Sequence, residues 1–155
     1  MTASAGFGIV GAPLMEIDLE VAAPTDLGTV AGQARRQVAI TGGSVRGGYR
    51  GEVLPGGSDW QTVRPDGTLD IDARHILALE EGLVEVESRG LRAGPADVLA
   101  RLGRGEPVDP QAYYFRTALR FRTSAADLHR LNTILAIACG ERRAHSVRLT
   151  VYEVA

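Results

Sequence analysis

The stretch TLDIDARHILALEEGLVEVESRGLR, residues 68–92, decides the fold. Apolar and polar side chains alternate along 68–79 and again along 83–92, which is the period-two pattern of a β-strand. Glu80, Glu81 and Gly82 separate the two runs and form a short hairpin connection. The stretch therefore predicts two long strands that pair in antiparallel fashion.

Strand patterns continue on both sides of this hairpin. They cover residues 15–21, 36–41, 49–54, 59–64, 113–122, 134–138 and 146–154. Only 95–102 and roughly 124–132 have helical patterns. Because strand follows strand, the sequence predicts an all-β fold: an antiparallel, closed or nearly closed barrel of about 8–10 strands with one or two short helices. Residues 1–11 are expected to form a flexible arm, and 12–155 a single barrel domain.

Composition excludes several classes of function. A net charge of −2 over 155 residues argues against a nucleic-acid partner or an acidic membrane surface. No apolar run is long enough to span a membrane and no signal peptide is visible, so we expect a cytoplasmic protein. All seventeen basic residues are arginine, which excludes a lysine Schiff base. The single cysteine and three scattered histidines predict no metal site, and we expect no cofactor.

The segment GEVLPGGSDWQTVRPDG, residues 51–67, predicts the wall of a polar pocket. It combines two turn signals with a short polar strand that holds the only tryptophan. Alternation puts Asp59 and Gln61 on one face and Trp60 on the other. Asp59 either binds a ligand together with Gln61 or caps the preceding turn. Trp60 either packs in the core or stacks on a flat ligand.

Two further strands carry candidate site residues. On 68–79, Asp72 and Arg74 share a face, where they form either a solvated ion pair or a fork for an anion. His75 lies on the apolar face, where it is either packed or a general base. On 113–122, Arg116 is a second candidate for holding an anion, and Tyr113 or Tyr114 is a candidate phenolic donor. Asn132 either caps a helix end or contacts the ligand.

Several motifs occur together in one order: GG…G at 42–51, PGGxDWQ at 55–61, RxDG at 64–67, DxR at 72–74, YFRT at 114–117 and LN at 131–132. In these motifs the chain resembles the DUF3237 family over nearly its whole length beyond the arm. The resemblance implies a small β-barrel, often dimeric, with no assigned general function, and favours Asp72 and Arg74 in the lumen. His75 stands where the pattern usually has Tyr, and residues 128–130 replace the usual aromatic pair.

These observations favour a small-molecule-binding barrel that is a cofactor-independent enzyme. Isomerase, cyclase or lyase chemistry on a small carbonyl or aromatic compound is expected, with no nucleic acid or membrane as partner and with a homodimer as the assembly. The alternatives are a non-catalytic carrier of a small aromatic or acidic ligand and a structural protein that acts through dimerisation. We expect at least two of Asp59, Asp72, Arg74 and Arg116 to face one cavity. The predicted proton-moving groups are Asp59, Asp72 and His75, and the predicted substrate-binding groups are Trp60, Gln61, Arg74, Tyr114, Arg116 and Asn132.

Overall fold

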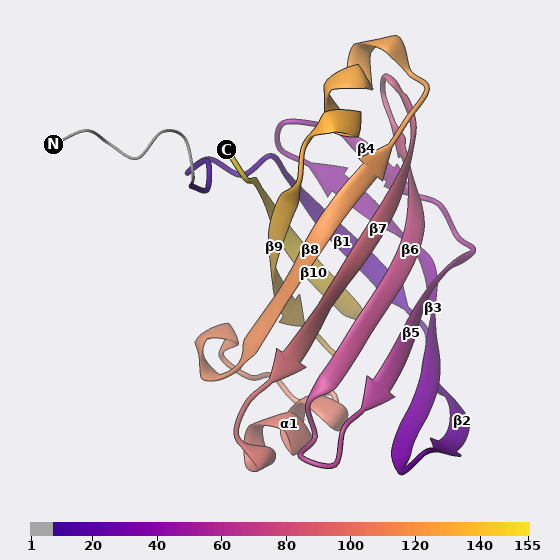
Figure 1. Ribbon diagram of the computed structural model, residues 1–155, viewed down its shortest axis with the longest axis vertical. Coiled ribbons are helices and arrows are strands. Elements are labelled where there is room, and N and C mark those ends of the chain that lie inside the picture. Colours follow the sequence, from indigo (N-terminus) through magenta and orange to yellow (C-terminus); the bar gives the residue numbers. More distant parts are fainter. Residues whose placement is uncertain (1–7) are drawn as a thin grey trace, which may run out of the picture.

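Antiparallel strands follow one another along the chain and close into a barrel (Figure 1). The structure is a computed structural model that describes residues 8–155. The strands are β1 (Met15–Val21), β2 (Thr25–Val30), β3 (Gln33–Arg46), β4 (Gly51–Val53), β5 (Gly57–Val63), β6 (Leu69–Leu79), β7 (Gly82–Ala93), β8 (Tyr114–Arg122), β9 (Ala136–Arg142) and β10 (Ser146–Glu153). The helices are α1 (Ala96–Gly103) and the 3₁₀ segments η1 (Pro110–Ala112) and η2 (Ala126–Thr133).

The barrel closes because β1 pairs with β10 on one side and with β3 on the other. The short strands β4 and β5 both pair with β3 on one side and with β6 on the other. They therefore count as one position in the barrel, which has eight strand positions. β2 pairs with β3 alone and extends the barrel wall as a hairpin. The predicted closed antiparallel barrel is confirmed.

Two hydrophobic clusters lie toward the two ends of the barrel. The larger cluster lies toward η2 and includes Leu77, Val84 and Leu128. The smaller one lies toward α1 and joins Val98 and Leu102 of that helix to strand residues. Figure 1 shows α1 at one end of the barrel and η2 at the other. The space between the clusters holds the polar residues described below.

Several elements differ from expectation, among them β9, which spans Ala136–Arg142 where 134–138 was expected. β2 was not predicted, β3 is longer than 36–41, and the predicted helix at 124–132 is a 3₁₀ segment. Ile9, within the predicted arm, forms a bridge with Val154, while residues 1–7 of that arm lie outside the described residues. No helix in the described part of the chain is long and apolar enough to cross a membrane.

Candidate functional site

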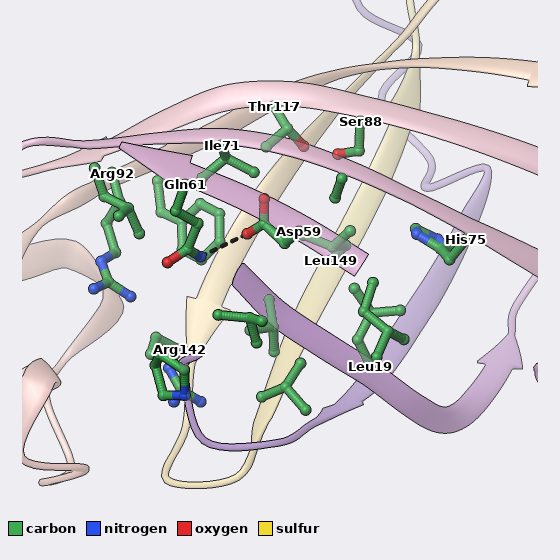
Figure 2. A pocket seen from close by; sticks show the side chains of 18 of the residues that line it. Leu19, Asp59, Gln61, Ile71, His75, Ser88, Arg92, Thr117, Arg142 and Leu149 are labelled. Atoms are coloured by element: carbon green, nitrogen blue, oxygen red, sulfur yellow. Dashed lines mark hydrogen bonds between the residues drawn. The ribbon is translucent and has the colours of Figure 1, made fainter. Parts of the chain in front are cut away.

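A cavity occupies the barrel lumen between the two hydrophobic clusters, and residues of both clusters line it. The cavity has a volume of about 70 Å³, which is room for a few waters or a small organic molecule. Its apolar lining comes from most of the barrel strands and includes Leu19, Ile71 and Leu149. Figure 2 shows polar groups projecting among these side chains. The polar lining residues are Arg36, Asp59, Gln61, His75, Ser88, Arg92, Thr117 and Arg142.

Strand alternation decides which side chains enter the cavity. On β6, Ile71, Ala73 and His75 are buried and line the lumen, whereas Asp72 and Arg74 between them point outward. On β5, Asp59 and Gln61 line the lumen, and Trp60 lies on the outer surface with 47% of its area exposed. Each polar residue of the site thus occupies an inward position of a regular strand.

A chain of hydrogen bonds connects three of the polar groups. Arg36 Nε donates to Gln61 Oε1 at 2.6 Å. Gln61 Nε2 in turn donates to Asp59 Oδ2 at 2.6 Å, the bond drawn in Figure 2. The backbone N–H of Asp72 donates to Asp59 Oδ1 at 3.0 Å. The amide of Gln61 is therefore oriented from both sides, and it fixes the Asp59 carboxyl against β6.

The Asp59 carboxyl is held in a low-dielectric position. Burial raises the pKa of this carboxyl, and the bonds from Gln61 and the Asp72 backbone offset only part of that rise. A carboxyl whose pKa is shifted upward toward neutrality accepts and returns protons more readily than an ordinary aspartate. Asp59 is the one carboxyl among the described residues that line the cavity.

Three arginines line the lumen on the α1 side of this carboxyl. Burial and the neighbouring charges of Arg36 and Arg142 lower the pKa of Arg92 to about 10. Burial also lowers the pKa of Arg36 and that of Arg142. All three remain charged at neutral pH, so with one carboxylate the cavity carries a net positive charge. Buried guanidinium groups of this kind bind carboxylate, enolate or phenolate oxygens.

Several buried polar atoms of the cavity have no hydrogen-bond partner within residues 8–155. They are both ring nitrogens of His75, Nε of Arg92 and Oγ1 of Thr117. Burial lowers the pKa of His75 to about 4, so its ring is neutral at pH 7. Native proteins rarely leave buried polar atoms unpaired, so these atoms mark the lumen as a candidate binding site.

The arginines also line hollows on the surface. Arg36 and Arg92 line a surface hollow that reaches Leu99 and Gly103 of α1. Arg142 lines a second hollow on the other side of Gly103. The arginine side of the cavity therefore lies next to these surface hollows beside α1.

The structure brings three predicted site residues into the cavity: Asp59, Gln61 and His75. At least two of Asp59, Asp72, Arg74 and Arg116 were expected to face one cavity. Only Asp59 lines the lumen. The expected placement of Asp72 and Arg74 in the lumen is wrong. Arg74 is 56% exposed and lies near Glu85 and Glu87 on the outer wall, each at 3.7 Å. Asp72 accepts a hydrogen bond from Arg89 on the same outer face.

The other predicted residues also lie outside the lumen. Arg116 packs over the ring of exposed Tyr114, with 5.1 Å from the guanidinium carbon to the ring centroid, and donates to the Phe115 carbonyl. Both line an open groove on the outer wall. Asn132 bonds the backbone of Thr123 in both directions, at 2.8 and 3.0 Å, in the connection between β8 and η2. Asn132 therefore fixes this connection. Its position gives no support to the predicted contact with a ligand.

Five cavity residues were not singled out from the sequence: Arg36, Ser88, Arg92, Thr117 and Arg142. Each lies on the same face of its strand as the buried apolar residues, as Arg36 does with Val38 and Ile40. A polar residue that interrupts an inward apolar series is the signal that identifies them. Within the described range, no three His, Cys, Asp or Glu side chains group as a metal site requires.

Comparisons with known proteins agree with the fold and assign no reaction. A UPF0311 protein of Bradyrhizobium diazoefficiens is 39% identical over 138 residues, which is 88% of both chains. The crystal structure of a conserved protein of unknown function from Rhodopseudomonas palustris matches with a TM-score of 0.88 at 34% identity, over the full length of both chains. An enzyme from Penicillium herquei shares the fold at a TM-score of 0.71 and 17% identity, covering 100% of this chain and 99% of its own. The family model described as "Protein of unknown function (DUF3237)" matches residues 11–154, and the chain therefore belongs to the DUF3237 family.

Proposed function

We propose that this protein is a cofactor-independent enzyme that binds a small carbonyl compound in the barrel lumen and moves a proton on it. The observation that carries the proposal is the position of Asp59, a carboxyl with a raised pKa, in a cavity with three arginines. A base beside a group of fixed cations is what enolisation requires.

The reaction follows from the groups present. Asp59 removes a proton from a C–H next to the carbonyl, and the bonding electrons move onto the carbonyl oxygen as an enolate. Arg36, Arg92 or Arg142 holds that oxygen. Return of the proton to a different carbon gives an isomerase, attack of the enolate within the same molecule a cyclase, and expulsion of a leaving group a lyase.

Asp59 suits the role of base better than the other two predicted groups. The Asp72 side chain lies on the outer wall, paired with Arg89 at 3.2 Å. His75 lines the cavity, but burial lowers its pKa to about 4, which makes the ring a weak base. Gln61 and the Asp72 backbone fix the Asp59 carboxyl, as a base must be positioned before it can act.

A second candidate is a carrier that binds a small aromatic or acidic molecule without reaction. The excess of three arginines over one carboxyl favours it, because recognition of an anion needs only the cations. In this case Arg92 Nε and Thr117 Oγ1, which lack partners in residues 8–155, pair with the ligand. The enzyme and the carrier differ in whether Asp59 exchanges a proton with the ligand.

Hydrogen–deuterium exchange separates the two candidates. The protein is incubated in D₂O with three enolisable acids, phenylpyruvate, 4-hydroxyphenylpyruvate and benzoylacetate, and loss of the C–H signal is followed by proton NMR. An enzyme accelerates exchange in at least one acid, and Asp59→Asn lowers the rate by about 10²- to 10⁴-fold. Arg74→Gln is the matched control, because this arginine lies on the outer wall, and it keeps the wild-type rate.

The remaining outcomes are also decisive. Wild-type protein that binds an acid without accelerating exchange is the carrier. Equal exchange rates in wild type and Asp59→Asn would remove Asp59 from the mechanism.

A further inference from the structure

The end of the lumen remote from the arginines is formed around His75. This residue is only 2% exposed, yet neither ring nitrogen has a hydrogen-bond partner in residues 8–155. The next inward residues of β6, Leu77 and Leu79, are apolar and belong to the larger hydrophobic cluster. His75 is therefore the last polar group of the inner face before the barrel becomes solid core.

A buried imidazole with no partner weakens the fold, because its polar atoms lose water and gain nothing in return. A leucine at this position would extend the apolar series Leu77–Leu79 without that cost. Stability alone does not account for His75, and its place on the cavity wall points to a ligand.

The charge state of the ring limits what that ligand group can be. The titratable and charged groups that line the same cavity are Asp59, Arg36, Arg92 and Arg142. Burial holds the pKa of His75 at about 4, so near pH 7 the ring offers one N–H donor and one nitrogen acceptor. A hydroxyl can donate to the free nitrogen or accept from the N–H, and a carbonyl can accept from the N–H, whereas an anion at this depth would face no cation.

Strand register orders the polar groups along the lumen. Arg92 is opposite Leu69, Gln61 is opposite Ile71, and Asp59 is opposite Ala73. His75 follows two residues after Ala73, about 7 Å further along β6. Figure 2 shows the same order, with Arg92 and Arg142 on one side, Asp59 and Gln61 between, and His75 on the other.

We propose that the lumen selects small monoanionic molecules that carry a neutral hydrogen-bonding group, a hydroxyl or a carbonyl, at the end opposite the anion. The arginines hold the anion on the α1 side, and His75 binds the neutral group at the closed end. This inference rests on the proposed function, since it names the substrate class of the same cavity. Asp59 then faces the middle of the bound molecule, where the reacting carbon lies.

Binding of three related acids tests the selection. The probes are 4-hydroxycinnamate, cinnamate and 4-carboxycinnamate, which have a distal hydroxyl, a distal hydrogen and a second anion. None has an enolisable C–H, so binding is measured apart from the proposed chemistry. By calorimetry, wild-type protein should prefer 4-hydroxycinnamate over cinnamate by about tenfold, the value of one well-placed buried hydrogen bond. It should bind 4-carboxycinnamate more weakly than cinnamate.

Variants at His75 assign the preference to this residue. His75→Leu should bring the ratio between 4-hydroxycinnamate and cinnamate close to one and leave cinnamate binding intact. His75→Gln keeps a donor and an acceptor, and should retain most of the preference. His129→Leu is the matched control, because that histidine is exposed on η2, and should keep the wild-type ratio. Circular dichroism spectra and unfolding curves show that each variant is folded.

The outcomes separate this inference from the proposed function. A preference that survives in folded His75→Leu overturns the role of His75, as does a wild type that binds cinnamate and its hydroxyl derivative equally. Either result leaves proton exchange by Asp59 unaffected. Conversely, loss of the hydroxyl preference in His75→Leu supports the inference even in a protein that catalyses no exchange.

Discussion

At the scale of single residues, His75 makes the stability of the fold depend on pH. Its pKa falls from 6.5 in an unfolded chain to about 4 in the barrel because the ring is buried. Below about pH 6.5 the His75 ring is therefore protonated in the unfolded chain, whereas in the folded chain it stays neutral until about pH 4. The free energy of unfolding is expected to fall by roughly 3 kcal/mol across this window as the pH decreases.

Urea unfolding of wild type and His75→Leu between pH 7.5 and 4 measures this contribution. The variant should be more stable at every pH in the window, with the difference widening toward pH 4. Asp59, whose raised pKa acts in the opposite direction, is present in both proteins and largely cancels from the difference. Parallel pH profiles would show that the ring is solvated or paired in solution.

Residue identity and strand parity together could predict part of the site. Asp59 and Gln61 were placed on one face and Trp60 on the other, and this is the arrangement observed. Parity alone does not say which face is the lumen when both carry polar groups. On β6, the face with Asp72 and Arg74 looked chemically richer, yet the apolar face with His75 lies inside.

At the scale of elements, β7 and β8 approach each other closely at Gly90. A Cβ at this position would lie 2.0 Å from the Arg116 carbonyl oxygen and 2.6 Å from the Thr117 Cα, both of them backbone atoms. Since the backbone of β8 cannot move without breaking its pairing, Gly90→Ala is expected to destabilise the protein by about 3 kcal/mol or more. The free energy of unfolding in urea measures the effect.

Gly103→Ala is the matched control for this prediction. Gly103 ends α1, and a Cβ there would meet nothing within 4 Å. Alanine favours the helix, so this variant should be as stable as wild type or more stable by up to about 1 kcal/mol. Similar stability of the two variants would contradict the close approach of β7 and β8.

The sequence allowed most elements to be predicted, and the misses have physical reasons. Long alternating runs such as β6 and β7 are recognisable because one face is buried. β2 is exposed along its whole length and pairs only with β3, so it carries no inward apolar series to recognise. η2 buries only Leu128 and Leu131, too few positions to distinguish a 3₁₀ segment from an α-helix.

At the scale of the whole molecule, the barrel has a cavity between two hydrophobic clusters. The cavity encloses buried arginines, a carboxyl and atoms that lack partners in residues 8–155. A domain of this size could fill its lumen with apolar side chains and gain stability. The cavity is therefore where this fold gives up stability, as the proposed binding site would require. The homodimer implied by the family resemblance stays a prediction.

Filling the lumen should remove binding without unfolding the barrel. Ala73 is 6% exposed on the inner face of β6, opposite Asp59 on one side and Ser88 on the other. In Ala73→Leu the larger side chain occupies the cavity, and the free energy of unfolding is expected to stay equal or rise. The same change at Ala78, on the outer face of β6, is the control and should leave the lumen open.

Thermal unfolding with 4-hydroxycinnamate at about 100 times its dissociation constant reports on both variants. A ligand at that concentration stabilises the folded state by about 2.7 kcal/mol, which raises the Tm of a chain of this length by roughly 5–10 °C. Wild type and Ala78→Leu should show this rise, and Ala73→Leu should show almost none. An equal rise in Ala73→Leu would contradict binding beside Ala73 in the lumen.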